Sequence, residues 1–154
     1  MSIKLHDCIV FDIDETILKT PLNNTEEEMA KSKMFPIIER ILTSFDTLHL
    51  PYFFFTSRCE SLEKCTLKVL GEHRAPNLLM RPIEMNDWKI HTPFEVRKNQ
   101  IQRLKGMGYT PALVFDDNME ALRAFKIYAP GAILMKADPF NSGVHPTKED
   151  WNKR

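Results

Sequence analysis

Two hydrophobic patterns alternate along the chain. Short, mostly apolar runs bounded by polar residues are typical of strands buried on both faces of a parallel sheet. They occur at 8–11, 51–55, 77–81, 111–115 and 132–135. Apolar residues that recur about every three to four positions predict amphipathic helices, and this pattern covers 26–45, 60–70, 93–105 and 119–125. Strands and helices in this order predict a three-layer α/β/α fold around a central five-stranded parallel sheet.

Proline and glycine refine these boundaries. Pro36 is expected to divide or kink the helix over 26–45, because it lacks an N–H group and clashes with the preceding turn. From Lys136 onward the chain has few apolar residues and several prolines and glycines, which predicts an irregular C-terminal tail. We therefore expect one domain over 1–154, with its core at about 8–135 and its tail at 136–154.

Composition limits the protein class more than it identifies it. The chain has 154 residues, of which 43% are hydrophobic and 27% charged, as in ordinary globular domains. A formal net charge of zero argues against avid, non-specific binding of nucleic acid, although a local basic face stays open. Neither a membrane-spanning run nor a signal sequence is recognisable. Three cysteines without metal-binding spacing suggest reduced thiols, so we expect a cytoplasmic protein.

The most informative residues follow the first predicted strand. Asp12 and Asp14 come directly after the apolar run at 8–11, at the strand's carboxyl end, where ligands bind in open α/β sheets. Two carboxylates placed together repel each other unless a positive charge lies near, and Mg²⁺ is a natural partner for them. The alternative is a polar strand end whose aspartates cap the next helix.

Other strand ends and one helix carry compatible chemistry. The candidates are Thr56, Ser57, Arg58, Lys98, Asp116 and Asp117. Such groups suit phosphoryl transfer: an aspartate as nucleophile, a second carboxyl as acid, a hydroxyl and a cation around the phosphate, and carboxylates for Mg²⁺.

The Asp-x-Asp-x-Thr segment, Thr56, Lys98 and the pair Asp116 and Asp117 follow one another along the chain in the order found in haloacid-dehalogenase superfamily phosphatases. The chain resembles these proteins over most of its length, from Cys8 to Met135. The resemblance implies a Rossmann-like haloacid-dehalogenase fold and a Mg²⁺-dependent phosphatase that forms an aspartyl phosphate. Asp12 would be the nucleophile and a metal ligand. Asp14 would be the general acid and then the general base, with its backbone carbonyl on the metal. An acid at this position favours phosphatase over dehalogenase activity.

The later motifs complete the implied site. Thr56 would bind phosphate, with Ser57 and Arg58 beside it as further substrate-binding residues. Lys98 would steady the nucleophile and the phosphate. Asp116 would bind the metal directly, and Asp117 in the second shell or through water.

One residue departs from the family pattern, and the choice of the catalytic lysine stays open. Glu15 stands where glycine is usual, although carboxy-terminal-domain phosphatases have a similar Asp-x-Asp-Glu-Thr form. Lys89 and Lys105 are rivals of Lys98 for the catalytic lysine, and Lys98 is preferred because it lies inside a helix in a Val-x-Lys pattern.

The segments between the motifs are too short for a large cap domain. An open site suits either a phosphate on a large molecule or a small substrate enclosed by a second subunit, which would make the protein a homo-oligomer. Among capless relatives, the chain resembles the 3′-phosphatase domain of polynucleotide kinase/phosphatase. The implied substrate is therefore a polynucleotide 3′-phosphate or a nucleotide. The alternative is a non-catalytic protein of the same fold that binds phosphate or a partner, whereas a receiver-type phosphoacceptor is disfavoured because its acceptor follows strand three.

The polynucleotide hypothesis has its own candidate residues. Trp88 could stack on a base. Basic side chains that could line a strand of nucleic acid are Arg58, Arg74, Arg81, Lys89, His91 and Arg97.

Overall fold

The computed structural model describes residues 4–19, 26–85 and 91–137. Its centre is a five-stranded sheet in the order β5-β4-β1-β6-β7, and every neighbouring pair is parallel. The strands are β1 (His6–Asp12), β4 (Tyr52–Cys59), β5 (Leu78–Arg81), β6 (Tyr109–Asp116) and β7 (Ile133–Lys136). The predicted α/β fold with a five-stranded parallel sheet is confirmed.

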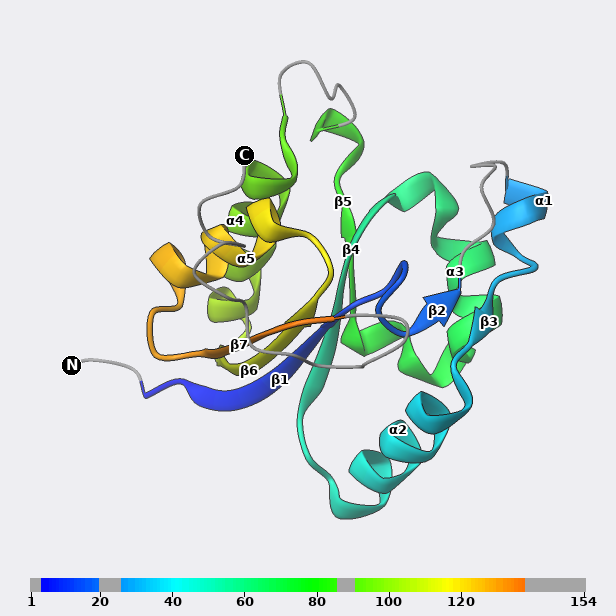
Figure 1. Ribbon diagram of the computed structural model, residues 1–154, viewed down its shortest axis with the longest axis horizontal. Helices are drawn as coiled ribbons and strands as arrows, with labels where there is room; N and C mark the ends of the chain where they lie inside the picture. The colour runs from blue at the N-terminus through cyan, green and yellow to red at the C-terminus, as the bar shows by residue number, and fades with distance from the viewer. Residues whose placement is uncertain (1–3, 20–25, 86–90, 138–154) are drawn as a thin grey trace.

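Helices cover both faces of this sheet (Figure 1). The α-helices are α1 (Glu26–Met29), α2 (Pro36–Leu48), α3 (Glu63–Leu70), α4 (Pro93–Gly106) and α5 (Met119–Tyr128). Short 3₁₀ helices are η1 (Glu60–Leu62), η2 (Glu72–Asn77) and η3 (Ile83–Met85). Among the described residues, no helix is long and apolar enough to cross a membrane.

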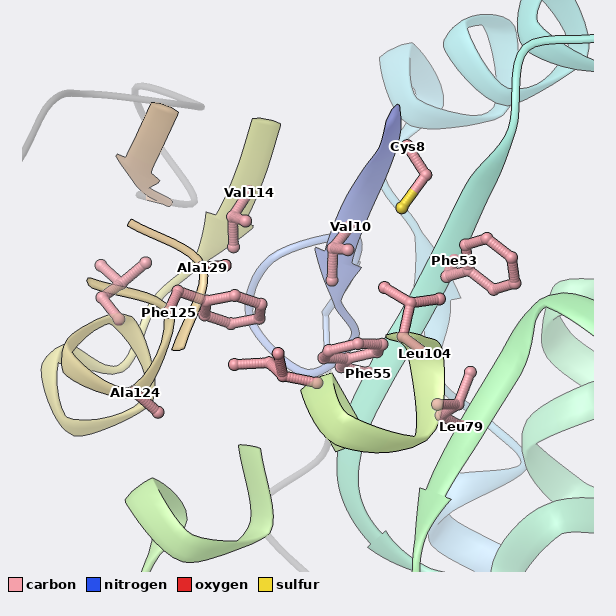
Figure 2. Close-up of a cluster of buried hydrophobic side chains, with 12 residues drawn as sticks. Cys8, Val10, Phe53, Phe55, Leu79, Leu104, Val114, Ala124, Phe125 and Ala129 are labelled. Atoms are coloured by element: carbon pink, nitrogen blue, oxygen red, sulfur yellow. The ribbon is translucent and has the colours of Figure 1, made fainter. Parts of the chain in front are cut away.

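Alternation along the strands sends side chains into two separate cores. Val10, Phe53 and Phe55 point toward α4 and α5, where they pack with Leu104 and Phe125 (Figure 2). Their neighbours in sequence belong to a second cluster on the α2 and α3 face, which includes Phe11, Tyr52, Phe54, Leu42 and Leu70. Successive strand residues face opposite sides, so one sheet serves both cores.

The structure corrects the helix predicted over 26–45. The segment divides into α1, the short strand β3 (Lys33–Met34) and α2, and β3 pairs with β2 (Leu18–Lys19). Pro36 is the first residue of α2, where its missing N–H costs nothing. Phe35 before it is extended, with ψ of 132°, as the proline ring requires.

The strand ends are also longer than predicted. β4 continues past Thr56 to Cys59, and β7 includes Lys136, which was assigned to the tail. The remaining tail, from 138 to 154, lies outside the described residues. Since β1 is flanked by β4 and β6, the chain reverses its direction of winding there. Ligands bind at such switch points in open sheets, beyond the carboxyl ends of the strands.

Candidate active site

The end of β1 holds the first aspartate rigidly. Asp12 is the last residue of β1 and only 6% exposed. Its Oδ2 accepts a hydrogen bond of 3.1 Å from the Thr16 hydroxyl. The intervening turn closes because the amides of Thr16, Ile17 and Leu18 all donate to the carbonyl of Ile13. The Asp-x-Asp-x-Thr segment is therefore a compact loop that fixes Asp12.

The turn requires an unusual backbone at Glu15. Its φ is 60°, in the left-handed region, and its amide donates 2.9 Å to the Leu18 carbonyl. This conformation is unfavourable for residues with a Cβ and free of that penalty for glycine. Glu15 therefore adopts this conformation at a cost that glycine would not have.

Three carboxylates meet between β1 and β6. Asp12, Asp116 and Asp117 each place one oxygen within 4.8 Å of the others. Burial raises the pKa of Asp12 well above its usual range, and the Asp116 charge raises it further, against the opposing effect of Arg97. Burial also raises the pKa of Asp116, although Arg97 and the Asn118 amide lower it. The structure brings these three aspartates together, and the repulsion between their carboxylates suits a cation.

A buried arginine, not the predicted lysine, lies between the two strand ends. Arg97 Nη2 is 2.6 Å from Asp12 Oδ1, and its Nε is 3.0 Å from Asp116 Oδ2. Burial lowers the pKa of the Arg97 guanidinium, but the nearby carboxylates of Asp116 and Asp12 raise it by more, so its pKa lies above the ordinary value. Three carboxylates around one guanidinium leave a negative excess that a divalent cation would match, so these residues fit Mg²⁺.

The structure does not bring Lys98 to these aspartates. Its ammonium lies 5.3 Å from the centre of the Tyr128 ring, a cation–π distance. The two other candidate lysines are Lys105, which the structure describes, and Lys89, which it does not. The Lys105 ammonium donates to the Tyr128 carbonyl, whereas Lys89 lies outside the described residues.

Arg97 was missed as a site residue because sequence motifs favoured its neighbour. One step along a helix turns a side chain by about 100°. A usable signal existed, since Arg97, Ile101 and Leu104 recur at core spacing and all three are buried. A charge on an apolar helix face requires a buried partner.

The second strand supplies the other predicted groups. Thr56 is fully buried, and its hydroxyl accepts a 3.0 Å hydrogen bond from the Arg58 amide. Ser57, next in the strand, is half-buried. Gln100 donates 2.8 Å to the Thr56 carbonyl and 3.0 Å to the Leu79 carbonyl. The side chain of Gln100, which sequence reasoning also missed, therefore connects α4 to β4 and β5.

Arg58 holds the second aspartate. Its Nη2 lies 2.7 Å from Asp14 Oδ1, and its Nε lies 3.0 Å from Oδ2, so the pair is bidentate. The same guanidinium donates to the hydroxyls of Thr66 and Ser32. The Asp14 side chain is 31% exposed and that of Arg58 only 2%. Arg58 therefore orients a carboxylate that is open to solvent.

One of the proposed nucleic-acid contacts, Arg74, lies in the interior. Arg74 is buried and binds Tyr52, Asp46 and the Leu70 carbonyl, so it is a structural residue and does not line a surface groove. His91 lies 3.6 Å from Glu95, on α4. Trp88 lies outside the described residues.

No family model matches this chain, and no curated protein matches it. Solved structures do resemble it. Two structures of the Pnkp1/Rnl/Hen1 complex, one described as an RNA repair complex, share 14% and 13% identity at TM-scores of 0.68 and 0.69, over 87% and 90% of this chain. This chain spans less than half of each of those, 46% and 44%.

Two further structures match with wider coverage. A class C acid phosphatase from Bacillus anthracis shares 16% identity at a TM-score of 0.59, over 96% of this chain and 70% of that one. A hydrolase from Pseudomonas syringae shares 12% identity at a TM-score of 0.61, over 96% and 89%. At these identities the likeness shows the fold alone. It confirms the expected Rossmann-like α/β fold around a five-stranded parallel sheet.

Proposed function

We propose that this protein is a Mg²⁺-dependent phosphomonoesterase that works through an aspartyl phosphate on Asp12. The observation that supports this proposal most is that Asp12 and Asp14 have different surroundings. Asp12 is held in one orientation by Arg97 and Thr16 beside Asp116, which suits a positioned nucleophile, whereas Asp14 is partly open to solvent, where it can exchange a proton with a leaving group or water. Asp12, Asp116, Asp117 and the backbone carbonyl of Asp14 would hold Mg²⁺, which when bound neutralises charge on the phosphate.

The chain's own residues account for the remaining steps. An oxygen of Asp12 attacks phosphorus, the bond from phosphorus to the leaving oxygen breaks, and Asp14 gives that oxygen a proton. Water then attacks the acyl phosphate, Asp14 takes a proton from it, and inorganic phosphate leaves while the Asp12 carboxylate is restored. Thr56 and Ser57 bind phosphate oxygens from the end of β4. Arg97, rather than Lys98, supplies the fixed positive charge beside Asp12.

The proposed substrate is a polynucleotide 3′-phosphate or a nucleotide. Its support is the sequence resemblance to polynucleotide 3′-phosphatases and the structural likeness to the Pnkp1/Rnl/Hen1 complex. As a working picture, the chain is one domain in the cytoplasm that acts on a phosphate ester, alone or as a homo-oligomer.

The first test is phosphate release from p-nitrophenyl phosphate and from 3′- and 5′-phosphorylated oligonucleotides, with Mg²⁺ or with EDTA. Asp12→Asn should abolish release, and Asp7→Asn, an exposed aspartate on the same strand, should leave it unchanged. Mg²⁺ should also raise the melting temperature of the wild type more than that of Asp12→Asn, because ligand binding stabilises the folded state. If no substrate releases phosphate while Mg²⁺ still binds, the phosphate-binding alternative is favoured.

A further inference from the structure

The strands β6 and β7 are covered unequally on their two faces. Toward α4 and α5, Val114 of β6 is fully buried, and Leu134, its partner in β7, packs against the same core. The neighbouring pairs along these strands point to the opposite face, and they consist of Leu113 with Ile133 and Phe115 with Met135. Ile133 is 54% exposed, and the other three are half-buried. On this second face, β6 and β7 therefore carry apolar side chains that the described helices do not enclose.

The helix that borders this face leaves a groove beside it. α2 buries Ile38 and Leu42 in the second core. Its next apolar stripe recurs every four residues and consists of Ile37, Ile41 and Phe45. Between this stripe and Leu113 and Phe115 of β6 lies an apolar groove of about 340 Å³, and no charged side chain is among its described lining. Its outer rim is open, since Ile37 is 59% exposed.

The chain itself leads into this groove. Ala137, the last described residue, follows β7, belongs to the groove wall and is 8% exposed. Its amide donates a 2.9 Å hydrogen bond to the Asp116 carbonyl, which fixes the point where the chain leaves the sheet. The segment 138–154 starts there, and its first large apolar residue is Phe140. Three residues span at most about 10 Å, so the Phe140 side chain is within reach of the groove.

We propose that the segment 138–154 docks on this face and that the Phe140 side chain fills the groove between α2 and β6. Parallel sheets are normally covered on both faces, and this segment begins where the cover is incomplete. An apolar groove without charges suits a phenyl ring, whose burial is favourable. Its volume is near the lower end of the roughly 300–1,000 Å³ of ligand pockets, which suits one or two side chains.

The docked segment lies behind the catalytic turn. Thr16 is part of the groove lining, and its hydroxyl donates to Asp12 Oδ2. Phe140 in the groove thus completes the packing behind the loop that fixes Asp12. This role concerns the fold of the domain, and it holds whether or not the protein is a phosphatase.

Cross-linking in the full chain tests the proximity. Ile37→Cys combined with Phe140→Cys should form an intramolecular cross-link with a short bis-maleimide. The described native thiols are buried, so the wild type serves as the blank. The matched control pairs Phe140→Cys with Leu48→Cys, on the same helix, since Leu48 is 66% exposed and is not among the described lining residues. Equal yields from the two pairs would overturn the proposal, as would cross-linked dimers in place of monomers, which would assign the groove to a second copy.

A double-mutant cycle tests the energetic contact. Phe140→Ala and Ile41→Ala should each lower the urea midpoint of the full chain, and their combined effect should be smaller than the sum, because both remove the same contact. Phe140→Ala with Leu48→Ala should be additive. If Phe140→Ala does not fold, Phe140→Leu carries the cycle. Additivity between positions 140 and 41 would overturn the proposal.

Dye binding tests whether the groove is covered. The wild type should bind little 8-anilinonaphthalene-1-sulfonate, and Phe140→Ala should bind several-fold more, because the dye reports exposed apolar surface. Asn141→Ala, next to Phe140, is the matched control and should behave as the wild type. Equal dye binding by the wild type and Phe140→Ala would overturn the proposal. None of these three measurements depends on phosphate release, so their outcome is separate from that of the proposed function.

Discussion

At the scale of single residues, Glu15 has a backbone conformation that its side chain disfavours, with φ of 60°. Glu15→Gly should therefore stabilise the protein by about 1 kcal/mol, because glycine adopts this region without the Cβ penalty. Urea unfolding measures the change. Glu120→Gly, in the first turn of α5, is the opposite control and should destabilise. A loss of stability in Glu15→Gly would mean that contacts of the glutamate side chain exceed the backbone cost.

Arg97 and Lys98 differ sharply despite being neighbours. Arg97→Gln should lower the free energy of unfolding by about 3–5 kcal/mol, because it leaves Asp12 and Asp116 buried without their cation. Arg97→Lys should recover part of this loss. Lys98→Gln should cost about 1 kcal/mol or less, the value of a cation–π contact. The measurement is chemical denaturation of all three, and equal losses at both positions would contradict the assignment of Arg97.

The residues that sequence could place are those whose position follows from strand ends. Asp12, Asp116 and Thr56 were predicted because apolar runs locate the strands, and parallel strands bring their carboxyl ends together. Arg97 and Gln100 could not be chosen by motif, because their roles depend on which helix face meets the sheet. That orientation is a tertiary property, visible only when α4 packs against β4 and β5.

At the scale of elements, a buried polar group joins the end of α2 to the start of β4. The Tyr52 hydroxyl donates 2.6 Å to Asp46 Oδ1 and accepts 3.2 Å from Arg74 Nε, so one phenol links α2, β4 and η2. Burial, followed by the hydrogen bond to Asp46, raises the pKa of Tyr52 to about 12, against the lowering effect of Arg74.

This pKa predicts a loss of stability at high pH. The pKa of Tyr52 in the folded protein lies above the ordinary value of 10.0. The protonated Tyr52 therefore contributes its full stabilisation of the folded state below about pH 10, and this stabilisation is lost as the pH rises toward about 12. The free energy of unfolding should fall by about 2 kcal/mol over this window because of Tyr52 alone. Tyr52→Phe should lack this component, whereas Tyr109→Phe should retain it. Denaturation at several pH values tests this, and equal slopes in both variants would contradict it.

Element boundaries were predictable where local chemistry decides them. The division expected at Pro36 is confirmed, because the backbone before a proline must be extended. The helix was wrong over 30–35, where apolar spacing continues but the chain leaves α1 and forms β3. The strand pair formed by β2 and β3 was invisible in the sequence, since two-residue strands carry no detectable alternation.

At the scale of the whole molecule, the alternation of strands and helices was enough to predict the layers. The strand order β5-β4-β1-β6-β7 was not predicted, because pairing between strands is set by long-range contacts that no local pattern encodes. The two hydrophobic cores, unlike the strand order, follow from the apolar pattern of the strands. Strands that are apolar on both faces must be covered on both, and α2 and α3 cover one face while α4 and α5 cover the other (Figure 1).

The gradient of burial across the site has a consequence for how this protein can change over generations. On the side of β1 and β6, Asp12, Arg97 and Asp116 are almost fully enclosed, and each depends on another for charge balance. A substitution there must be compensated at once. On the side of β4 and β5, the half-buried Ser57 and Leu62 border open space, and single replacements meet fewer constraints. Under the proposed function, new substrates are thus accessible by small steps at one edge of the sheet, while the residues proposed for the chemistry at the other edge stay unchanged.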